Sequence, residues 1–163
     1  MKVYHLHQKQ ILPLTIDEAW DFFSSPKNLV RITPAHMDFN ILHITGEGSK
    51  MYPGQIISYR VKLFPFVTVR WVTEITHVQE PYYFVDNQLT GPYALWHHQH
   101  RFRQVPGGVE MTDEITYAIA LGVIGRLANY LFVEKQLKTI FRFRYSILEK
   151  LFAENQIHVT QTA

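Results

Sequence analysis

The chain of 163 residues has no cysteine, little net charge and no long apolar run, and each absence excludes a class of protein. Without cysteine it cannot form a disulfide or a thiolate metal site, which is typical of a cytoplasmic protein. The net charge of +2, with no dense basic cluster, argues against a nucleic-acid partner. No stretch approaches the roughly eighteen apolar residues of a membrane-spanning helix, and the first residues lack a signal-peptide core. We therefore expect a cytoplasmic protein without stable membrane insertion.

The composition describes a globular chain that is rich in large rings. Apolar residues make up 47% of the sequence, charged residues 18% and aromatic residues 14%. A chain of this length fits one domain with its own core, so we expect a single domain over 1–163, as a monomer or a homodimer. Large flat side chains suit either a wide core or a cavity that rings line.

The predicted order of elements is one strand, two short helices, six strands and one long helix. A strand over 3–12 is followed by a capping box at Thr15 and Glu18, and Pro26 opens a second short helix. Over 37–121, apolar and polar residues alternate, and turns rich in glycine and proline separate the segments. Because these connections are short, we expect the strands to form an antiparallel meander.

The stretch 122–153 predicts a long terminal helix. Large apolar residues recur there every three or four positions: Leu127, Tyr130, Leu137, Phe141, Tyr145, Leu148 and Phe152. A helix of about thirty residues is about 45 Å long and needs a large partner surface. We therefore predict an α+β architecture in which a curved antiparallel sheet of about seven strands wraps around this helix. Glu134 and Arg144 interrupt the apolar face, and they either reach solvent at its edge or meet the polar end of a ligand in a cavity.

Short motifs along the chain carry a resemblance to a known superfamily. They are 28–34 (Asn-Leu-Val-Arg-Ile-Thr-Pro), 91–93 (Gly-Pro-Tyr), 96–102 (Trp-His-His-Gln-His-Arg-Phe), 113–117 (Asp-Glu-Ile-Thr-Tyr), 121–126 (Leu-Gly-Val-Ile-Gly-Arg) and 140–145 (Ile-Phe-Arg-Phe-Arg-Tyr). Together with the order of elements, they resemble the SRPBCC superfamily, whose helix-grip fold includes START lipid-transfer domains, plant pollen-allergen folds and polyketide cyclase/dehydratases. The nearest resemblance is to bacterial members labelled cyclase/dehydrase or cell-division-inhibitor-like.

The resemblance implies a fold and an internal cavity but no particular reaction, because one fold serves carriers, enzymes and sensors. Two features depart from the pattern. The usual proline near the junction of strand and helix is replaced by 119–121 (Ile-Ala-Leu), and the sequence holds no motif of the nucleotide-sugar-epimerase-like domain to which some of those bacterial members are fused. Since no Gly-x-Gly-x-x-Gly motif follows a strand, we expect no nicotinamide cofactor and no other cofactor.

Residues able to carry chemistry lie on two strands that flank a predicted hairpin. Strand alternation puts His98 and His100 on a face with large rings, and Asp113 on the same face of the next strand. A turn at 107–108 would set Asp113 diagonal to His100, and a turn at 106–107 would set it directly opposite. Either register pairs a carboxylate with an imidazole.

Three interpretations of this pair stay open. It can be a buried structural pair, a device that orients a ligand, or an acid–base pair for cyclisation or dehydration with His98, His100 and Asp113 as catalytic candidates. Chelation is a variant, because the two histidines share a face and Asp113 or Asp86 could complete a site. No third ligand stands at a recognised spacing, so we predict no metal site and expect chelation to leave the thermal stability unchanged.

The predicted strand over 82–90 could turn either of its two faces toward the core. Periodicity favours the face of Val85 and Leu89, which is the more apolar one. The resembled superfamily favours Phe84, Asp86 and Gln88 inside, and we adopt that assignment because it brings two more polar groups near the histidines.

We predict that the protein binds a small hydrophobic or aromatic molecule, lipid-, polyketide- or isoprenoid-like, between the sheet and the long helix. The predicted ligand-binding residues are Tyr59, Trp71, Phe84, Asp86, Gln88, Trp96, His98, His100, Asp113, Tyr117, Leu137, Phe141 and Tyr145. A cyclase/dehydratase enzyme and a regulatory interaction protein are the alternatives. No nucleophile or phosphate-binding loop accompanies the histidines, which favours a binder over an enzyme.

Overall fold

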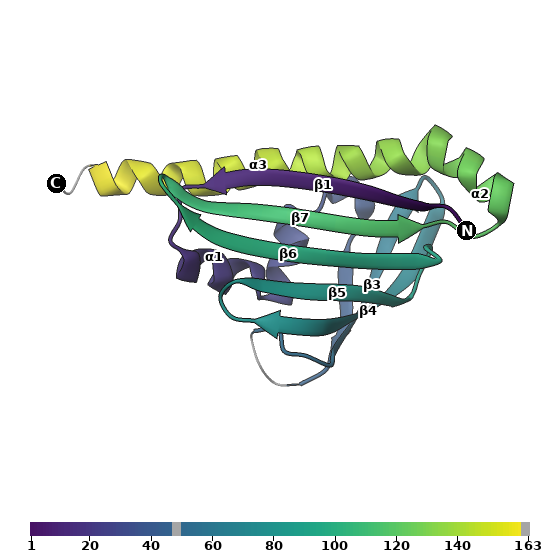
Figure 1. Cartoon of the computed structure of the whole chain (residues 1–163), viewed down its shortest axis with the longest axis horizontal. Helices are drawn as coiled ribbons and strands as arrows, with labels where there is room; N and C mark the ends of the chain where they lie inside the picture. The colour runs from purple at the N-terminus through teal and green to yellow at the C-terminus, as the bar shows by residue number, and fades with distance from the viewer. Residues whose placement is uncertain (47–49, 161–163) are drawn as a thin grey trace.

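A curved antiparallel sheet and one long helix form the frame of the protein (Figure 1). The structure, a computed structural model, describes residues 1–46 and 50–160, with 154–160 as backbone only. The strands are β1 (Val3–Leu12), β2 (Asn40–Ile44), β3 (Gln55–Phe64), β4 (Val67–Gln79), β5 (Tyr83–Thr90), β6 (Leu95–Val105) and β7 (Gly108–Ala118). Their order is β1-β7-β6-β5-β4-β3-β2, and neighbours are antiparallel. The predicted meander is confirmed, and β1 completes the sheet beside β7.

Short helical segments connect β1 to β2: α1 (Ile16–Phe23), η1 (Pro26–Ile32) and η2 (Ala35–Met37). The predicted capping box is present, since Glu18 N donates to Thr15 Oγ1 over 3.3 Å and Thr15 N donates to Glu18 Oε2 over 2.8 Å. The second predicted helix is a 3₁₀ helix, η1, and Ser25 forms no side-chain cap there. These segments place apolar side chains against one end of the sheet.

The long helix is continuous but changes its winding near its start. α2 (Gly122–Ala128) passes through a π-helical turn, η3 (Asn129–Val133), into α3 (Glu134–Thr160), which runs along the sheet beside β1 (Figure 1). A π turn widens the helix and rotates the residues before it relative to those after it. The apolar face predicted at 100° per residue therefore fails at the start of the helix, where Leu127 before the π turn and Tyr130 within it are 58% and 77% exposed. Among the described helices, none combines the length and apolar character needed to cross a membrane.

The buried core consists of two clusters, and α3 contributes to both. One cluster surrounds α1 and includes Trp20, Phe102 and Leu148. The other lies toward the opposite end of the sheet and includes Tyr59, Trp71, Trp96, Ile115, Tyr117, Leu137 and Phe141. α3 therefore covers the concave face of the sheet along its length, and the second cluster contains six of the thirteen residues predicted to bind a ligand.

Candidate functional site

The concave face of the sheet and α3 enclose a pocket with a volume of about 160 Å³. Rings form much of its wall: Tyr59 on β3, Trp71 on β4, Trp96 on β6 and, facing them, Phe141 on α3. Tyr59 stacks on Trp71 with ring centroids 5.9 Å apart, and Trp71 meets Trp96 edge-on at 5.2 Å. Side chains of α1 and η1 close a further side. The result is an aromatic cleft beneath the long helix.

Most of the residues predicted to bind a ligand line this pocket: Tyr59, Trp71, Phe84, Asp86, Trp96, His98, His100, Leu137 and Phe141. On β5, the assignment taken from the resemblance holds for Phe84 and Asp86, which face the pocket. Val85, on the other face of β5, is nevertheless buried at 5% exposure. This burial explains why periodicity alone favours the wrong face of the strand.

Gln88 and Tyr117 do not line the pocket, although the sequence predicts them there. Gln88 Nε2 donates to the backbone oxygen of Tyr93 over 2.7 Å, and Tyr93 N donates to Gln88 Oε1 over 3.2 Å. Gln88 therefore holds the connection between β5 and β6 instead of facing a ligand. Tyr117 is buried beneath other rings, stacked on Tyr4 at 5.4 Å and edge-on to Tyr93 at 5.8 Å.

Arg144, and not Tyr145 as the sequence predicts, lines the pocket at this point of α3. The inward row on α3 runs from Leu137 to Phe141 and then steps three residues to Arg144. Arg144 is 9% exposed, and its guanidinium lies 4.9 Å from the centre of the Phe141 ring. Tyr145 is half-buried on the flank, where its backbone oxygen accepts a hydrogen bond from Gln10 Nε2 over 3.0 Å. The sequence already indicates this, because Arg144 is a polar residue on the otherwise apolar face of the predicted helix.

Ionisable side chains from three adjacent strands meet on the inner face of the sheet. The hairpin between β6 and β7 has its turn at 106–107, which sets His100 directly opposite Asp113. On the other side of β6, β5 sets Asp86 opposite His98. The predicted interaction of His100 with Asp113 is therefore confirmed, and a second carboxylate joins it from β5.

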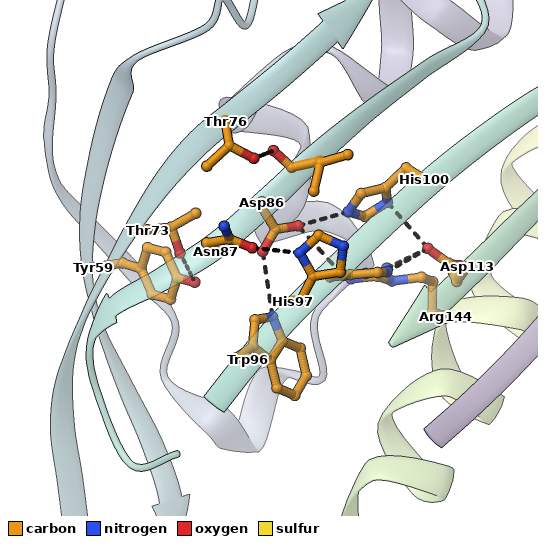
Figure 2. A network of polar contacts seen from close by, with 12 residues as sticks. Tyr59, Thr73, Thr76, Asp86, Asn87, Trp96, His97, His100, Asp113 and Arg144 are labelled. Atoms are coloured by element: carbon orange, nitrogen blue, oxygen red, sulfur yellow. Dashed lines mark hydrogen bonds and ion pairs between the residues drawn. The ribbon is translucent and has the colours of Figure 1, made fainter. Parts of the chain in front are cut away.

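These four side chains, Asp86, His98, His100 and Asp113, form a closed ring of contacts that we call the His–Asp cluster. Asp113 Oδ1 lies 2.8 Å from His98 Nε2 and 3.1 Å from His100 Nδ1. Asp86 Oδ2 lies 3.4 Å from His98 Nδ1 and 2.8 Å from His100 Nε2. Each imidazole thus spans the two carboxylates, as Figure 2 shows for His100. Asp113 lies behind the two rings and does not itself line the pocket.

Two further side chains support the carboxylates. Arg144 Nη1 lies 3.7 Å from Asp113 Oδ1, and Trp96 Nε1 donates to Asp86 Oδ1 over 3.3 Å (Figure 2). Asp113 is fully buried, and its Oδ2 has no hydrogen-bond partner among the described residues; the same holds for Arg144 Nε. Unpaired buried polar atoms are costly. The cluster therefore has unused capacity to donate and accept hydrogen bonds.

The cluster favours ionised carboxylates. Burial by itself raises the pKa of Asp113, but hydrogen bonds with His100 and His98 outweigh burial and hold this pKa well below its ordinary value. Burial also raises the pKa of Asp86, and the charge of His98 with the hydrogen bond of His100 brings it below its ordinary value. Both groups are therefore acceptors at neutral pH.

The two imidazoles are pushed in opposite directions. Burial lowers the pKa of His98, and the neighbouring charge of His100 lowers it further, against the opposing effect of Asp86 and Asp113. Burial lowers the pKa of His100 too, but its hydrogen bonds with Asp113 and Asp86 outweigh burial and raise it above its ordinary value. Neighbouring groups whose pKa values are separated in this way can act as a proton donor and a proton acceptor.

The arrangement also has the donor atoms for a metal ion. The prediction of no metal site rested on the lack of a third ligand at a recognised spacing. In the structure, β5 supplies one, because a donor atom from each of Asp86, His98 and His100 lies within 4.8 Å of the others. The site can therefore orient a polar group, move a proton or ligate a cation.

The chain matches no protein-family model and no curated protein, but solved structures resemble it along most of its length. A protein of Thermus thermophilus is 14% identical, and the similarity covers 93% of this chain and 99% of that chain, with a TM-score of 0.67. The di-domain ARO/CYC protein BexL, from the BE-7585A biosynthetic pathway, is 15% identical; the similarity covers 91% of this chain and 49% of BexL, with a TM-score of 0.67.

A point mutant of norcoclaurine synthase from Thalictrum flavum, in complex with a transition-state analogue, is also similar. It is 13% identical, the similarity covers 95% of this chain and 97% of that chain, and the TM-score is 0.68. At such low identity these likenesses concern the fold, which in each case spans nearly the whole of this chain. The chain therefore has the helix-grip fold that the sequence predicts, with a seven-stranded antiparallel sheet and a long C-terminal helix.

Proposed function

We propose that the protein binds a small hydrophobic or aromatic molecule in the pocket between the sheet and α3. The observation that carries the proposal is the pocket wall, where Tyr59, Trp71, Trp96 and Phe141 surround one space beside the His–Asp cluster. Small-molecule sites combine such apolar walls with a few polar groups that fix orientation. An apolar cavity of about 150 Å³ accepts a molecule such as benzene. The pocket of about 160 Å³ therefore has room for a ring-sized part of a ligand.

The polar groups beside the pocket indicate what the other end of the ligand carries. Arg144, His98, His100 and Asp86 all line the pocket, and Arg144 Nε is a buried donor without a partner among the described residues. A carbonyl or hydroxyl oxygen would satisfy that donor. A polyketide- or isoprenoid-like molecule with one oxygenated end suits the site better than a pure hydrocarbon.

A second candidate function is acid–base catalysis of the cyclase/dehydratase kind. His98 faces the pocket, and its Nε2 lies 2.8 Å from Asp113 Oδ1, which is the arrangement that orients a catalytic imidazole. BexL is named for an ARO/CYC role and norcoclaurine synthase for a synthase, so this fold accommodates reactions as well as binding. In this protein, the same cluster would exchange a proton with the oxygenated end of the ligand.

A pair of tryptophan substitutions on α3 tests the binding proposal. Ile140 lines the pocket, so Ile140→Trp should fill it, whereas Phe143→Trp adds bulk on the exposed side of the same helix. We expect native mass spectrometry to find a co-purified small molecule on the wild type and on Phe143→Trp but not on Ile140→Trp. Overpacking costs about 1 to 3 kcal/mol, so a thermal melt has to show that Ile140→Trp remains folded.

The fluorescent probe 1-anilinonaphthalene-8-sulfonate extends the test to a protein purified without a ligand. We expect Ile140→Trp to bind it about tenfold more weakly than Phe143→Trp, because a factor of ten corresponds to only about 1.4 kcal/mol of lost pocket contact. Equal binding by the two variants, with no co-purified molecule on the wild type, would contradict the proposal. A recovered molecule that loses the mass of one water on incubation would favour the enzyme.

A further inference from the structure

The His–Asp cluster has four contacts between a ring nitrogen and a carboxylate oxygen, and two neutral imidazoles supply only two N–H groups for them. Both nitrogens of His98 and both nitrogens of His100 face carboxylate oxygens, at distances from 2.8 to 3.4 Å. A neutral imidazole has one N–H and one lone pair. If both rings donate to Asp113 Oδ1, their other nitrogens direct lone pairs at the negatively charged Asp86 Oδ2. A positive charge between His98 Nδ1, His100 Nε2 and Asp86 Oδ2 removes this repulsion.

A metal ion placed there has three suitable ligands. We propose that Asp86, His98 and His100 bind a divalent first-row transition-metal ion such as Zn²⁺ or Fe²⁺ at the wall of the pocket. Metal–ligand distances of about 2.0 to 2.2 Å place neighbouring donors of a tetrahedral ion about 3.3 Å apart. The distances from Asp86 Oδ2 to the facing nitrogens of His98 and His100, 3.4 and 2.8 Å, lie close to this value. A donor atom from each of the three residues lies within 4.8 Å of the others, so side-chain rotations are needed to bring all three onto one ion.

Asp113 occupies the position of an outer carboxylate that supports metal-binding histidines. Histidines that bind metals usually donate their other ring N–H to a carboxylate, which fixes the tautomer and the ring orientation. Asp113 Oδ1 can accept from both rings, at 2.8 Å from His98 Nε2 and 3.1 Å from His100 Nδ1. With a metal bound on the other side, both imidazoles are neutral and every ring nitrogen has a partner.

Among the described residues, Asp86 and Asp113 differ in whether a permanent cation lies nearby. In the part of the chain that the structure describes, Asp86 forms ion pairs only with His98 and His100, and neither Lys nor Arg lies within ion-pair distance. Its side chain is 15% exposed. Asp113, by contrast, has Arg144 nearby. The carboxylate without a permanent cation is the one that faces the pocket.

The three ligands determine which metals can bind and whether the bound ion faces the pocket. Imidazole nitrogens suit Zn²⁺, Fe²⁺, Ni²⁺ or Cu²⁺, whereas Mg²⁺ and Ca²⁺ prefer oxygen ligands. Because all three ligands line the pocket, at least one coordination position faces it, where water or an oxygenated ligand can bind. The metal site is thus distinct from the apolar pocket wall and does not depend on a bound hydrophobic molecule.

Titration of the full-length protein with zinc tests the proposal. We expect protein treated with EDTA and then desalted to bind one equivalent of Zn²⁺ in a calorimetric titration, and its melting temperature to rise on binding. This is opposite to the expectation from residue spacing alone. Asp86→Asn should weaken binding at least about 100-fold, because even outer-sphere substitutions cost about 10- to 100-fold. His97→Asn is the matched control, since His97 neighbours His98 on β6 and contacts Asn87 instead.

An NMR titration of the wild type keeps the test independent of any variant that fails to fold. Zinc should shift the ring signals of His98 and His100 before those of His97. The proposal is overturned if the wild type takes up no zinc, if His97→Asn loses as much affinity as Asp86→Asn, or if the ring signals of the cluster do not move. Because the probe is the metal alone, any of these outcomes leaves the search for a co-purified apolar molecule unaffected.

Discussion

Two adjacent histidines on β6 have different environments because they lie on opposite faces of the sheet. His98 points inward, is 4% exposed and contacts Asp113 and Asp86. His97 points outward, and its Nδ1 lies 2.8 Å from the side-chain oxygen of Asn87 (Figure 2). β5 pairs Asp86 with the inner histidine and Asn87 with the outer one. Charged partners therefore occur inside and a neutral partner outside, which is the reverse of what burial alone favours.

The same contrast continues on β7. Asp113 lies inside with no exposed surface, whereas the next residue, Glu114, lies outside with Arg101 Nε 3.7 Å from its carboxylate. Exposed ion pairs contribute little, because solvent screens them and ordering two long side chains costs entropy. A buried carboxylate is retained only where several partners hold it. The buried His–Asp cluster is therefore costly to form, whereas the exposed contacts of His97 and Glu114 are solvated. This difference favours a functional role for the inner face.

The largest predicted effect on stability is that of replacing Asp113, the buried carboxylate of β7. In metal-free protein, Asp113→Asn should lower the free energy of unfolding by about 3 to 5 kcal/mol, because it leaves Arg144 and a protonated imidazole without their buried counter-charge. Glu114→Gln, one position along on the outer face, should change it by no more than about 0.5 kcal/mol. Urea denaturation of both variants in EDTA measures the difference.

A loss of about 1 kcal/mol or less for Asp113→Asn would contradict this prediction. It would match the interpretation of the pair as a device that orients a ligand, because solvent or ligand then reaches the pair and a neutral amide still bonds. The full burial of Asp113 is the reason for the larger value.

Much of the fold could be predicted from sequence because its signals are local. The capping box at Thr15 and Glu18, the alternation along β6 and β7 and the short glycine-containing hairpin each depend on neighbouring residues. Alternation and turn length also place His100 beside Asp113, since a two-residue turn restricts the register to two choices. These parts of the site follow from strand geometry alone.

The remaining parts of the site depend on contacts that no local pattern encodes. The helical pattern puts Arg144 on the apolar face of α3, but it does not show that the guanidinium there meets Asp113 from β7. Gln88 bonds to the backbone of Tyr93 across a turn, although its parity matches that of the pocket-facing residues. The side of the pocket formed by α1 and η1 arises from packing between distant segments, which periodicity does not describe.

The next prediction compares the two histidines directly. In metal-free protein, His98→Asn should lower the free energy of unfolding by about 1 to 3 kcal/mol, because both carboxylates lose a buried partner. His97→Asn should change it by about 0.5 kcal/mol or less, since solvent can replace the contact with Asn87. Thermal melts with EDTA present check both values. Equal losses would show that the inner and outer faces do not differ energetically at this strand position.

The smallest predicted effect on stability comes from comparing a buried with an exposed contact between uncharged hydroxyl groups. Tyr59 Oη and Thr73 Oγ1 lie 3.0 Å apart in the buried wall of the pocket, and Tyr52 Oη donates to Thr45 Oγ1 over 3.3 Å at the surface. Tyr59→Phe should lower the free energy of unfolding by about 1 kcal/mol, because it leaves the hydroxyl of Thr73 buried without its partner. Tyr52→Phe should change it by less than about 0.5 kcal/mol, since Tyr52 is 38% exposed and water can take its place.

A double-mutant cycle isolates the buried hydrogen bond itself. Tyr59→Phe, Thr73→Val and the double variant, measured by urea denaturation, should give a coupling free energy of at least about 0.5 kcal/mol, as residues in direct contact usually do. The double variant should also be more stable than the sum of the single losses predicts, because it removes donor and acceptor together and leaves neither unpaired. A coupling near zero would mean that water already reaches these hydroxyls through the pocket. The inner face would then be solvated at Tyr59, and the contrast between the faces would be confined to the His–Asp cluster.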